Sequence, residues 1–81
     1  MYRRNTYVAF LLVKVEPGKE KEVLDMIVER FRENVSEARI TYGEYDIVVR
    51  IEAATMRSLD AVIRAIRMLP GIVSTVTLLA A

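Results

Sequence analysis

The chain has 81 residues, of which 53% are hydrophobic and 28% are charged, so it has room for one hydrophobic core and is too apolar to be disordered. It contains neither cysteine nor histidine, which excludes disulfides, thiol nucleophiles, imidazole bases and the usual zinc sites. Twelve Lys and Arg residues against eleven Asp and Glu residues give a net charge of +1, which does not favour nucleic-acid binding.

The first two predicted elements are a strand and a helix. Residues 5–15 are rich in Val, Leu, Tyr and Phe, which favour a pleated backbone, and Pro17-Gly18 then interrupts the pattern. Residues 19–32 place apolar side chains at helical spacing, with acidic residues early and arginines late, as the helix dipole prefers. We therefore expect a strand over 5–15 and a helix over 19–32.

A hairpin is predicted in the middle of the chain. Residues 37–42 alternate charged and apolar side chains, and residues 46–53 are again rich in β-branched side chains. Gly43 and Glu44 lie between the two runs. Because Gly43 can take the positive φ of the first central position, we expect a type II′ turn at Gly43-Glu44.

The last two predicted elements are a second helix and a fourth strand. Thr55 is a suitable N-cap for a helix that ends before Pro70-Gly71, and Asp60 is spaced to pair with Arg57 and Arg64. Residues 72–79 are apolar or carry a hydroxyl and predict the closing strand. Three methionines are expected in the core of the helices: Met26, Met56 and Met68.

This order predicts the fold class and one assembly. Two βαβ units with right-handed crossovers give an α+β, ferredoxin-like βαββαβ domain over residues 1–81, with a four-stranded antiparallel sheet and both helices on one face. In the first strand, however, both alternating sets are apolar: Tyr7, Ala9, Leu11, Val13 and Val15 form one, and Val8, Phe10 and Leu12 the other. We expect a second copy to cover the remaining face, as a sheet-to-sheet homodimer. Shielding by loops or by the N-terminal residues is the alternative.

Several functions are not favoured. No apolar run approaches the roughly 20 residues of a membrane helix and no signal peptide is evident, so we expect a cytoplasmic protein without membrane contact. The three glycines are isolated, which argues against a phosphate loop, and the third strand lacks the aromatics of an RNA-recognition sheet. Neither a catalytic site, a metal site nor a cofactor is expected. Many Glu and Arg residues fit a thermophile composition.

Three segments together resemble the effector-binding (RAM) domain of the Lrp/AsnC family, the feast/famine transcriptional regulators. They are Ala9-Phe10-Leu11-Leu12-Val13-Lys14-Val15, Ile40-Thr41-Tyr42-Gly43-Glu44-Tyr45-Asp46-Ile47-Val48-Val49-Arg50, and Leu69-Pro70-Gly71-Ile72-Val73-Ser74-Thr75-Val76-Thr77-Leu78. The resemblance covers nearly the whole chain. It implies a domain that dimerises through its sheet and assembles further into tetramers or octamers, which bind amino acids between dimers.

The resemblance also implies binding residues. In such domains, backbone amides of the Gly-x-x-Asp hairpin meet the ligand carboxylate, the Asp meets its amino group, and polar residues of a neighbour's last strand complete the pocket. The ligand-binding residues carried over are Tyr42, Gly43, Asp46, Ser74, Thr75 and Thr77. Donors for a carboxylate and one anion for an ammonium suit a zwitterion. Each residue also has a structural interpretation: a strand-start carboxylate for Asp46, a hairpin glycine for Gly43 and strand propensity for the threonines.

The implied role has alternatives. Full-length family members begin with a helix-turn-helix domain, which the residues before the first strand cannot supply, so direct DNA binding is not expected. The chain is then a free-standing amino-acid sensor or a partner that associates with full-length Lrp/AsnC regulators. A ligand-free interaction domain is the second hypothesis. A small dimeric α+β barrel enzyme is the third, and an ACT-type sensor would share the topology.

Overall fold

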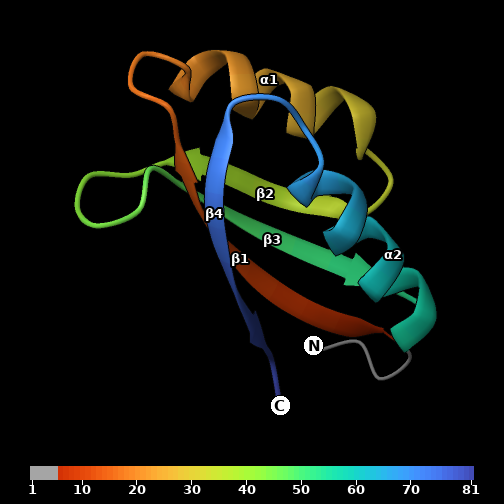
Figure 1. The fold of residues 1–81 in the computed structure, drawn as a ribbon. Helices are drawn as coiled ribbons and strands as arrows, with labels where there is room; N and C mark the ends of the chain where they lie inside the picture. Colours follow the sequence, from red (N-terminus) through yellow and green to blue (C-terminus); the bar gives the residue numbers. More distant parts are fainter. Residues whose placement is uncertain (1–5) are drawn as a thin grey trace.

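The fold is a four-stranded antiparallel sheet with two helices, seen in a computed structural model that describes residues 6–81. Its elements are β1 (Tyr7–Val15), α1 (Glu20–Arg30), β2 (Val35–Ile40), β3 (Ile47–Ala53), α2 (Met56–Arg67) and β4 (Ile72–Leu79). The strand order is β2-β3-β1-β4, which places β1 and β3 in the centre and β2 and β4 at the edges (Figure 1). The predicted ferredoxin-like α+β fold is therefore confirmed.

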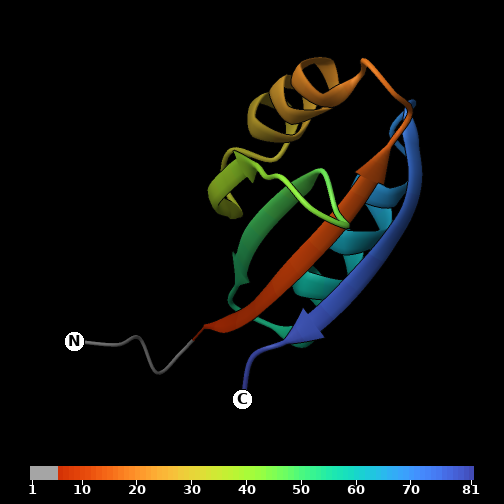
Figure 2. The ribbon, with the colours of Figure 1, turned by 90° about the vertical axis from the view of Figure 1, so that its left-hand side faces the viewer.

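One hydrophobic core joins the sheet to both helices. Alternate residues of the central strands are fully buried, among them Leu11 and Val49, and they contact Ile27 of α1 and Leu59 and Ile66 of α2 in one cluster. A pleated strand points every second side chain to the same face, so this alternation defines the helix-covered face of the sheet. Figure 2 shows β1 and β4 side by side, with α2 behind them.

Local signals explain where the second helix begins. The Thr55 hydroxyl oxygen accepts a hydrogen bond from the Ser58 backbone N–H at 3.0 Å, so it caps α2 as predicted. Asp60 pairs with Arg64 at 2.8 Å, whereas the predicted pair with Arg57 is not among the ion pairs of residues 6–81. With eleven and twelve residues, α1 and α2 are too short to cross a bilayer.

Several predicted boundaries need correction. The helix predicted over 19–32 is shorter at both ends, and the strand predicted over 37–42 begins and ends two residues earlier, at Val35 and Ile40. The first strand begins at Tyr7, and Asn5 lies outside the described residues. The early start of β2 has a physical cause, since the Asn34 carbonyl oxygen accepts a hydrogen bond from the Glu52 N–H at 2.8 Å. By contrast, β4 has the predicted bounds.

Two further predictions about individual side chains were wrong. Met68 and Met56 are exposed, at 83% and 44% of their surface, so of the three methionines only Met26 packs against the core. Met68 follows the last residue of α2 and lies outside its apolar stripe. Tyr7, the first residue of β1, is also exposed.

The second face of the sheet, called here the open face, has no helix on it within residues 6–81. Cross-strand partners identify its side chains, because residues directly opposite one another point to the same face. On β1 and β4 they are Val8, Phe10, Leu12, Lys14, Ser74, Val76 and Leu78; on β2 and β3 they are Glu37, Arg39, Val48, Arg50 and Glu52. The open face thus has an apolar half over β1 and β4 and a charged half over β2 and β3.

Candidate functional site

The loop 41–46 joins β2 to β3 and carries the predicted Gly-x-x-Asp residues. It is a six-residue loop, closed by a hydrogen bond from the Thr41 N–H to the Asp46 carbonyl oxygen at 2.8 Å and by one from the Thr41 hydroxyl to the Tyr45 carbonyl oxygen at 2.8 Å. The predicted two-residue type II′ turn is therefore wrong. Gly43 does have a positive φ, of 133°, although a Cβ there would meet nothing within 4 Å. Glycine is favoured by the backbone conformation, not by lack of space.

Asp46 fastens this loop to the end of β1. Its carboxylate oxygen Oδ2 accepts a hydrogen bond from the Val15 backbone N–H at 2.9 Å, and its own N–H donates to the Val13 carbonyl oxygen at 2.8 Å. The side chain is half-buried. An ionised carboxylate has about four lone-pair sites, so one such bond leaves acceptor capacity for an incoming donor. Asp46 thus has a structural role and spare capacity for a ligand.

The rest of the loop is turned to solvent. Tyr42 is fully exposed, Gly43 and Glu44 are exposed, and Tyr45 is half-buried. In Figure 1 the loop extends beyond the sheet at the end where β1 finishes and β4 begins. Such a loop leaves its backbone N–H groups and an aromatic ring available to a ligand or to a neighbouring molecule.

The predicted hydroxyl residues of β4 fall on two different faces. Thr75 lies opposite Val13 and Thr77 opposite Leu11, so both point to the helix-covered face; Ser74 lies opposite Lys14 and points to the open face. Since β1 lies between β3 and β4, two strand spacings, about 10 Å, separate the base of the loop from Thr75 in the same subunit. Within one chain, the structure does not bring the two predicted groups together.

A surface cavity of about 330 Å³ lies at the start of β4. Its lining includes two predicted residues, Ser74 and Thr75, together with Arg67 at the end of α2. Sequence reasoning did not select Arg67. Its proximity to Pro70-Gly71, which turns the chain straight back from α2 into β4, was the available signal. A guanidinium beside two hydroxyl residues provides donors for an anion.

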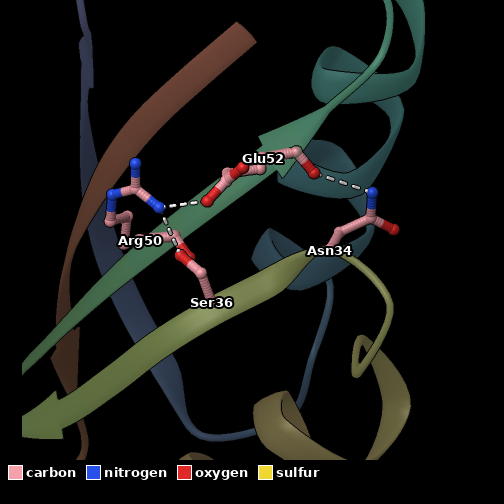
Figure 3. Close-up of polar contacts among 4 residues, drawn as sticks. All are labelled: Asn34, Ser36, Arg50 and Glu52. Carbon is pink, nitrogen blue, oxygen red and sulfur yellow. Dashed lines mark hydrogen bonds and ion pairs between the residues drawn. The ribbon is translucent and has the colours of Figure 1, made fainter. Parts of the chain in front are cut away.

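A polar network, also missed from sequence, lies at the opposite end of the sheet (Figure 3). The Arg50 guanidinium donates to the Ser36 hydroxyl at 2.8 Å and pairs with the Glu52 carboxylate. The Asn34 side-chain amide donates to the Glu52 carbonyl oxygen at 2.9 Å. A neighbouring cavity of about 340 Å³ includes Asn34, Ser36 and Glu52 in its lining. These groups satisfy one another, so the network fastens β2 to β3.

Among residues 6–81, no group of three or more carboxylate, imidazole or thiol side chains is placed to hold a metal ion. No buried side-chain nitrogen or oxygen of that range lacks a hydrogen-bond partner. The geometry instead offers exposed backbone donors, one carboxylate with spare acceptor capacity and an apolar open face.

Comparison with known proteins agrees with this geometry. The sequence model of the family described as Lrp/AsnC ligand binding domain matches residues 8–81. The HTH-type transcriptional regulator FL11 of Pyrococcus abyssi is 35% identical over 72 residues, which cover 89% of this chain and 46% of the regulator. The chain therefore spans about half the length of the curated relatives it matches.

Two solved structures are similar over almost their whole length. The crystal structure of FFRP-DM1 is 38% identical with a TM-score of 0.86, and the match covers 93% of this chain and 99% of that one. The hypothetical protein PHS023 from Pyrococcus horikoshii is also 38% identical, with a TM-score of 0.84, over 93% of this chain and 89% of that one. Both likenesses extend over the sheet and both helices.

Proposed function

The chain belongs to the Lrp/AsnC ligand-binding domain family, and from this premise we propose that residues 1–81 form a single effector-binding domain that binds an amino acid as an oligomer. The family is a ligand-binding domain of transcriptional regulators and not a family of enzymes. We further propose that the domain modulates transcription by associating with full-length Lrp/AsnC regulators. Direct contact with DNA is not part of the proposal.

The ligand proposal rests mainly on the carboxylate of Asp46. Its carboxylate is held in place by the Val15 N–H at 2.9 Å and still has lone pairs to offer. An ammonium group bound there makes a charge-assisted hydrogen bond, and the exposed backbone beside Gly43 supplies N–H donors for a carboxylate. Tyr42 adds an aromatic surface at the same place. These groups suit a free α-amino acid, which carries both charges on one carbon.

The last-strand hydroxyls enter the proposed site from a neighbouring subunit. In one chain, β1 lies between the loop and β4, and Thr75 and Thr77 point to the helix-covered face of the sheet. We assign Thr75 and Thr77 of a neighbour to the pocket wall. Ser74 points to the other face and contributes only if its backbone or a second subunit contact brings it in. Binding is then linked to assembly, because the site is complete only between subunits.

The open face supports the proposed sheet-to-sheet homodimer. Phe10 and Leu12 are half-buried, and the neighbouring Val76 and Leu78 are 38% and 51% exposed, which makes a continuous apolar area over β1 and β4. Apolar area of this kind on one side of a sheet marks an interaction surface. A second copy carries the same apolar area, so a two-fold dimer would bury both areas against each other.

A thermal-shift screen against the twenty amino acids tests the ligand proposal. We expect at least one amino acid to raise the melting temperature, because a ligand that binds only the folded state stabilises it. Asp46→Asn should remove this increase while leaving the unliganded melting temperature nearly unchanged, since the amide oxygen can still accept the Val15 N–H. Asp46→Ala should lower stability by about 1–3 kcal/mol, because the Val15 N–H loses its partner.

Two results would contradict this site. If Asp46→Asn keeps the full increase in melting temperature, the ammonium contact is wrong. If none of the twenty amino acids changes the melting temperature, the ligand-free interaction domain becomes the better description. A pull-down with a full-length Lrp/AsnC regulator then tests that description directly.

A further inference from the structure

The open face carries a cavity where its charged half meets its apolar half. The cavity has a volume of about 310 Å³ and is lined by Phe10, Glu37, Arg39, Thr41, Val48 and Arg50. Phe10 lies opposite Arg50, and Arg39 lies opposite Val48, so these side chains leave the three strands on the same face. Pockets that bind small molecules have volumes from about 300 Å³ upward. This cavity is therefore large enough for a small ligand.

The floor of the cavity is apolar. Phe10 and Val48 are half-buried and lie on β1 and β3, the two central strands of the sheet. Because each central strand is paired on both sides, the backbone beneath the cavity is held in place. A flat apolar group, such as an aromatic ring, removes both side chains from water when it lies on this floor. The floor therefore favours a ligand with a flat apolar body.

Two guanidinium groups at the rim of the cavity are held by neighbouring side chains. The Arg50 Nη1 donates to the Ser36 hydroxyl at 2.8 Å and pairs with the Glu52 carboxylate, and the Arg39 Nε donates to the Glu37 carboxylate at 2.8 Å. Within residues 6–81, the other nitrogens of these two groups make no hydrogen bond. Figure 3 shows the rest of the Arg50 guanidinium turned away from Ser36 and Glu52. Side chains that are already held lose less freedom when a ligand binds.

The polar groups of the lining favour an anion over a cation. The lining contains two guanidinium groups but only one carboxylate, that of Glu37, which already accepts from Arg39. The Thr41 hydroxyl donates its proton to the Tyr45 carbonyl oxygen at 2.8 Å. The side-chain donors that remain therefore belong to the two arginines, and guanidinium groups bind carboxylates through paired, charge-assisted hydrogen bonds.

We propose that this cavity binds a small organic anion with a flat apolar body and one carboxylate, the chemistry of an aromatic carboxylic acid. The apolar body lies on Phe10 and Val48, and the carboxylate binds Arg39 and Arg50. The site is distinct from the amino-acid site proposed above, because neither Asp46 nor any residue of β4 lines it. One chain supplies the whole lining, so the site needs no second copy to form it.

Isothermal titration calorimetry with 2-naphthoate tests this site, and 2-naphthamide is the neutral control of nearly the same shape. We expect 2-naphthoate to have a Kd about tenfold lower, because only its carboxylate makes charge-assisted hydrogen bonds with the guanidinium groups. Added salt should weaken the binding of 2-naphthoate alone, since salt screens the charges. Equal affinities of the two compounds, or no binding of 2-naphthoate at millimolar concentration, would overturn the proposal.

Arg39→Gln assigns the anion contact to the cavity. The Arg39 side chain is 75% exposed, so the substitution should leave the fold intact. We expect the Kd of 2-naphthoate to rise at least about fivefold and that of 2-naphthamide to change by less than about twofold. Arg57→Gln removes an exposed arginine of α2 outside the cavity and should change neither Kd. If both variants weaken 2-naphthoate equally, the anion is attracted by the overall charge and the cavity is not its site.

Failure of this site is distinguishable from failure of the proposed function. An amino acid that raises the melting temperature should not displace 2-naphthoate, because the two sites have different linings. If it does displace 2-naphthoate, both compounds share one site and the separate anion site is refuted. If no amino acid changes the melting temperature but 2-naphthoate binds and its affinity depends on Arg39, the proposed function fails and the anion site stands.

Discussion

The two faces of the sheet are built by alternate residues of the same strands, yet only one of them is covered by the helices. Leu11 points to the helices and is fully buried, whereas its neighbour Leu12 points to the open face and is only half-buried. Both are leucines in the middle of β1. The helix-covered face is completed within the chain, while the open face keeps an apolar half that needs a partner. Side-chain type alone therefore does not distinguish a residue for folding from a residue for assembly.

The largest loss of stability is expected from truncation of a side chain on the helix-covered face. Leu11→Ala removes a fully buried side chain from the middle of the core, and we expect the free energy of unfolding to fall by about 2–5 kcal/mol. Chemical denaturation measures this loss. Leu12→Ala is the matched control on the open face, and its effect on the unfolding of the single subunit should be clearly smaller. Equal losses would mean that the two faces are covered to the same extent.

A charge on the open face should break assembly while the fold persists. Leu12→Glu places a carboxylate among Val48 and Val76, so an interface formed there would bury an unpaired charge. We expect light scattering to show a shift from dimer to monomer, with the far-ultraviolet circular dichroism unchanged. Val28→Glu makes a similar substitution at an exposed aliphatic residue of α1 and should leave the mass unchanged. A wild-type chain that is already monomeric at micromolar concentration would contradict the dimer.

Much of the fold could be predicted from sequence because its signals are local. The bounds of β4 follow from Pro70-Gly71 and the apolar run after it, and the cap of α2 follows from Thr55. Alternation along β1 also predicts two apolar faces. The length of the loop between β2 and β3 could not be predicted from such local signals. Its last residue, Asp46, is held by hydrogen bonds to Val13 and Val15, more than thirty residues away in sequence.

The candidate site was only partly predictable for the same reason. Successive side chains of a strand point to opposite faces of the sheet, so the sequence already predicts that Ser74 and Thr75 lie on different faces. The distance between Asp46 and Thr75 was not, because it depends on the strand order that inserts β1 between them. Arg67 was missed because its place beside Ser74 and Thr75 arises from the tight connection between α2 and β4.

The smallest expected effect concerns the helix that covers the first face. Thr55→Ala removes the acceptor of the Ser58 N–H at the start of α2, and we expect a loss of about 1 kcal/mol in the free energy of unfolding. Because the cap lies in the helix layer, assembly through the open face should be unchanged in light scattering. Thr55→Ser keeps the hydroxyl oxygen and should restore most of the stability. If Thr55→Ala changed the mass but not the stability, the helix layer and the open face would not be independent, and the comparison between them would fail.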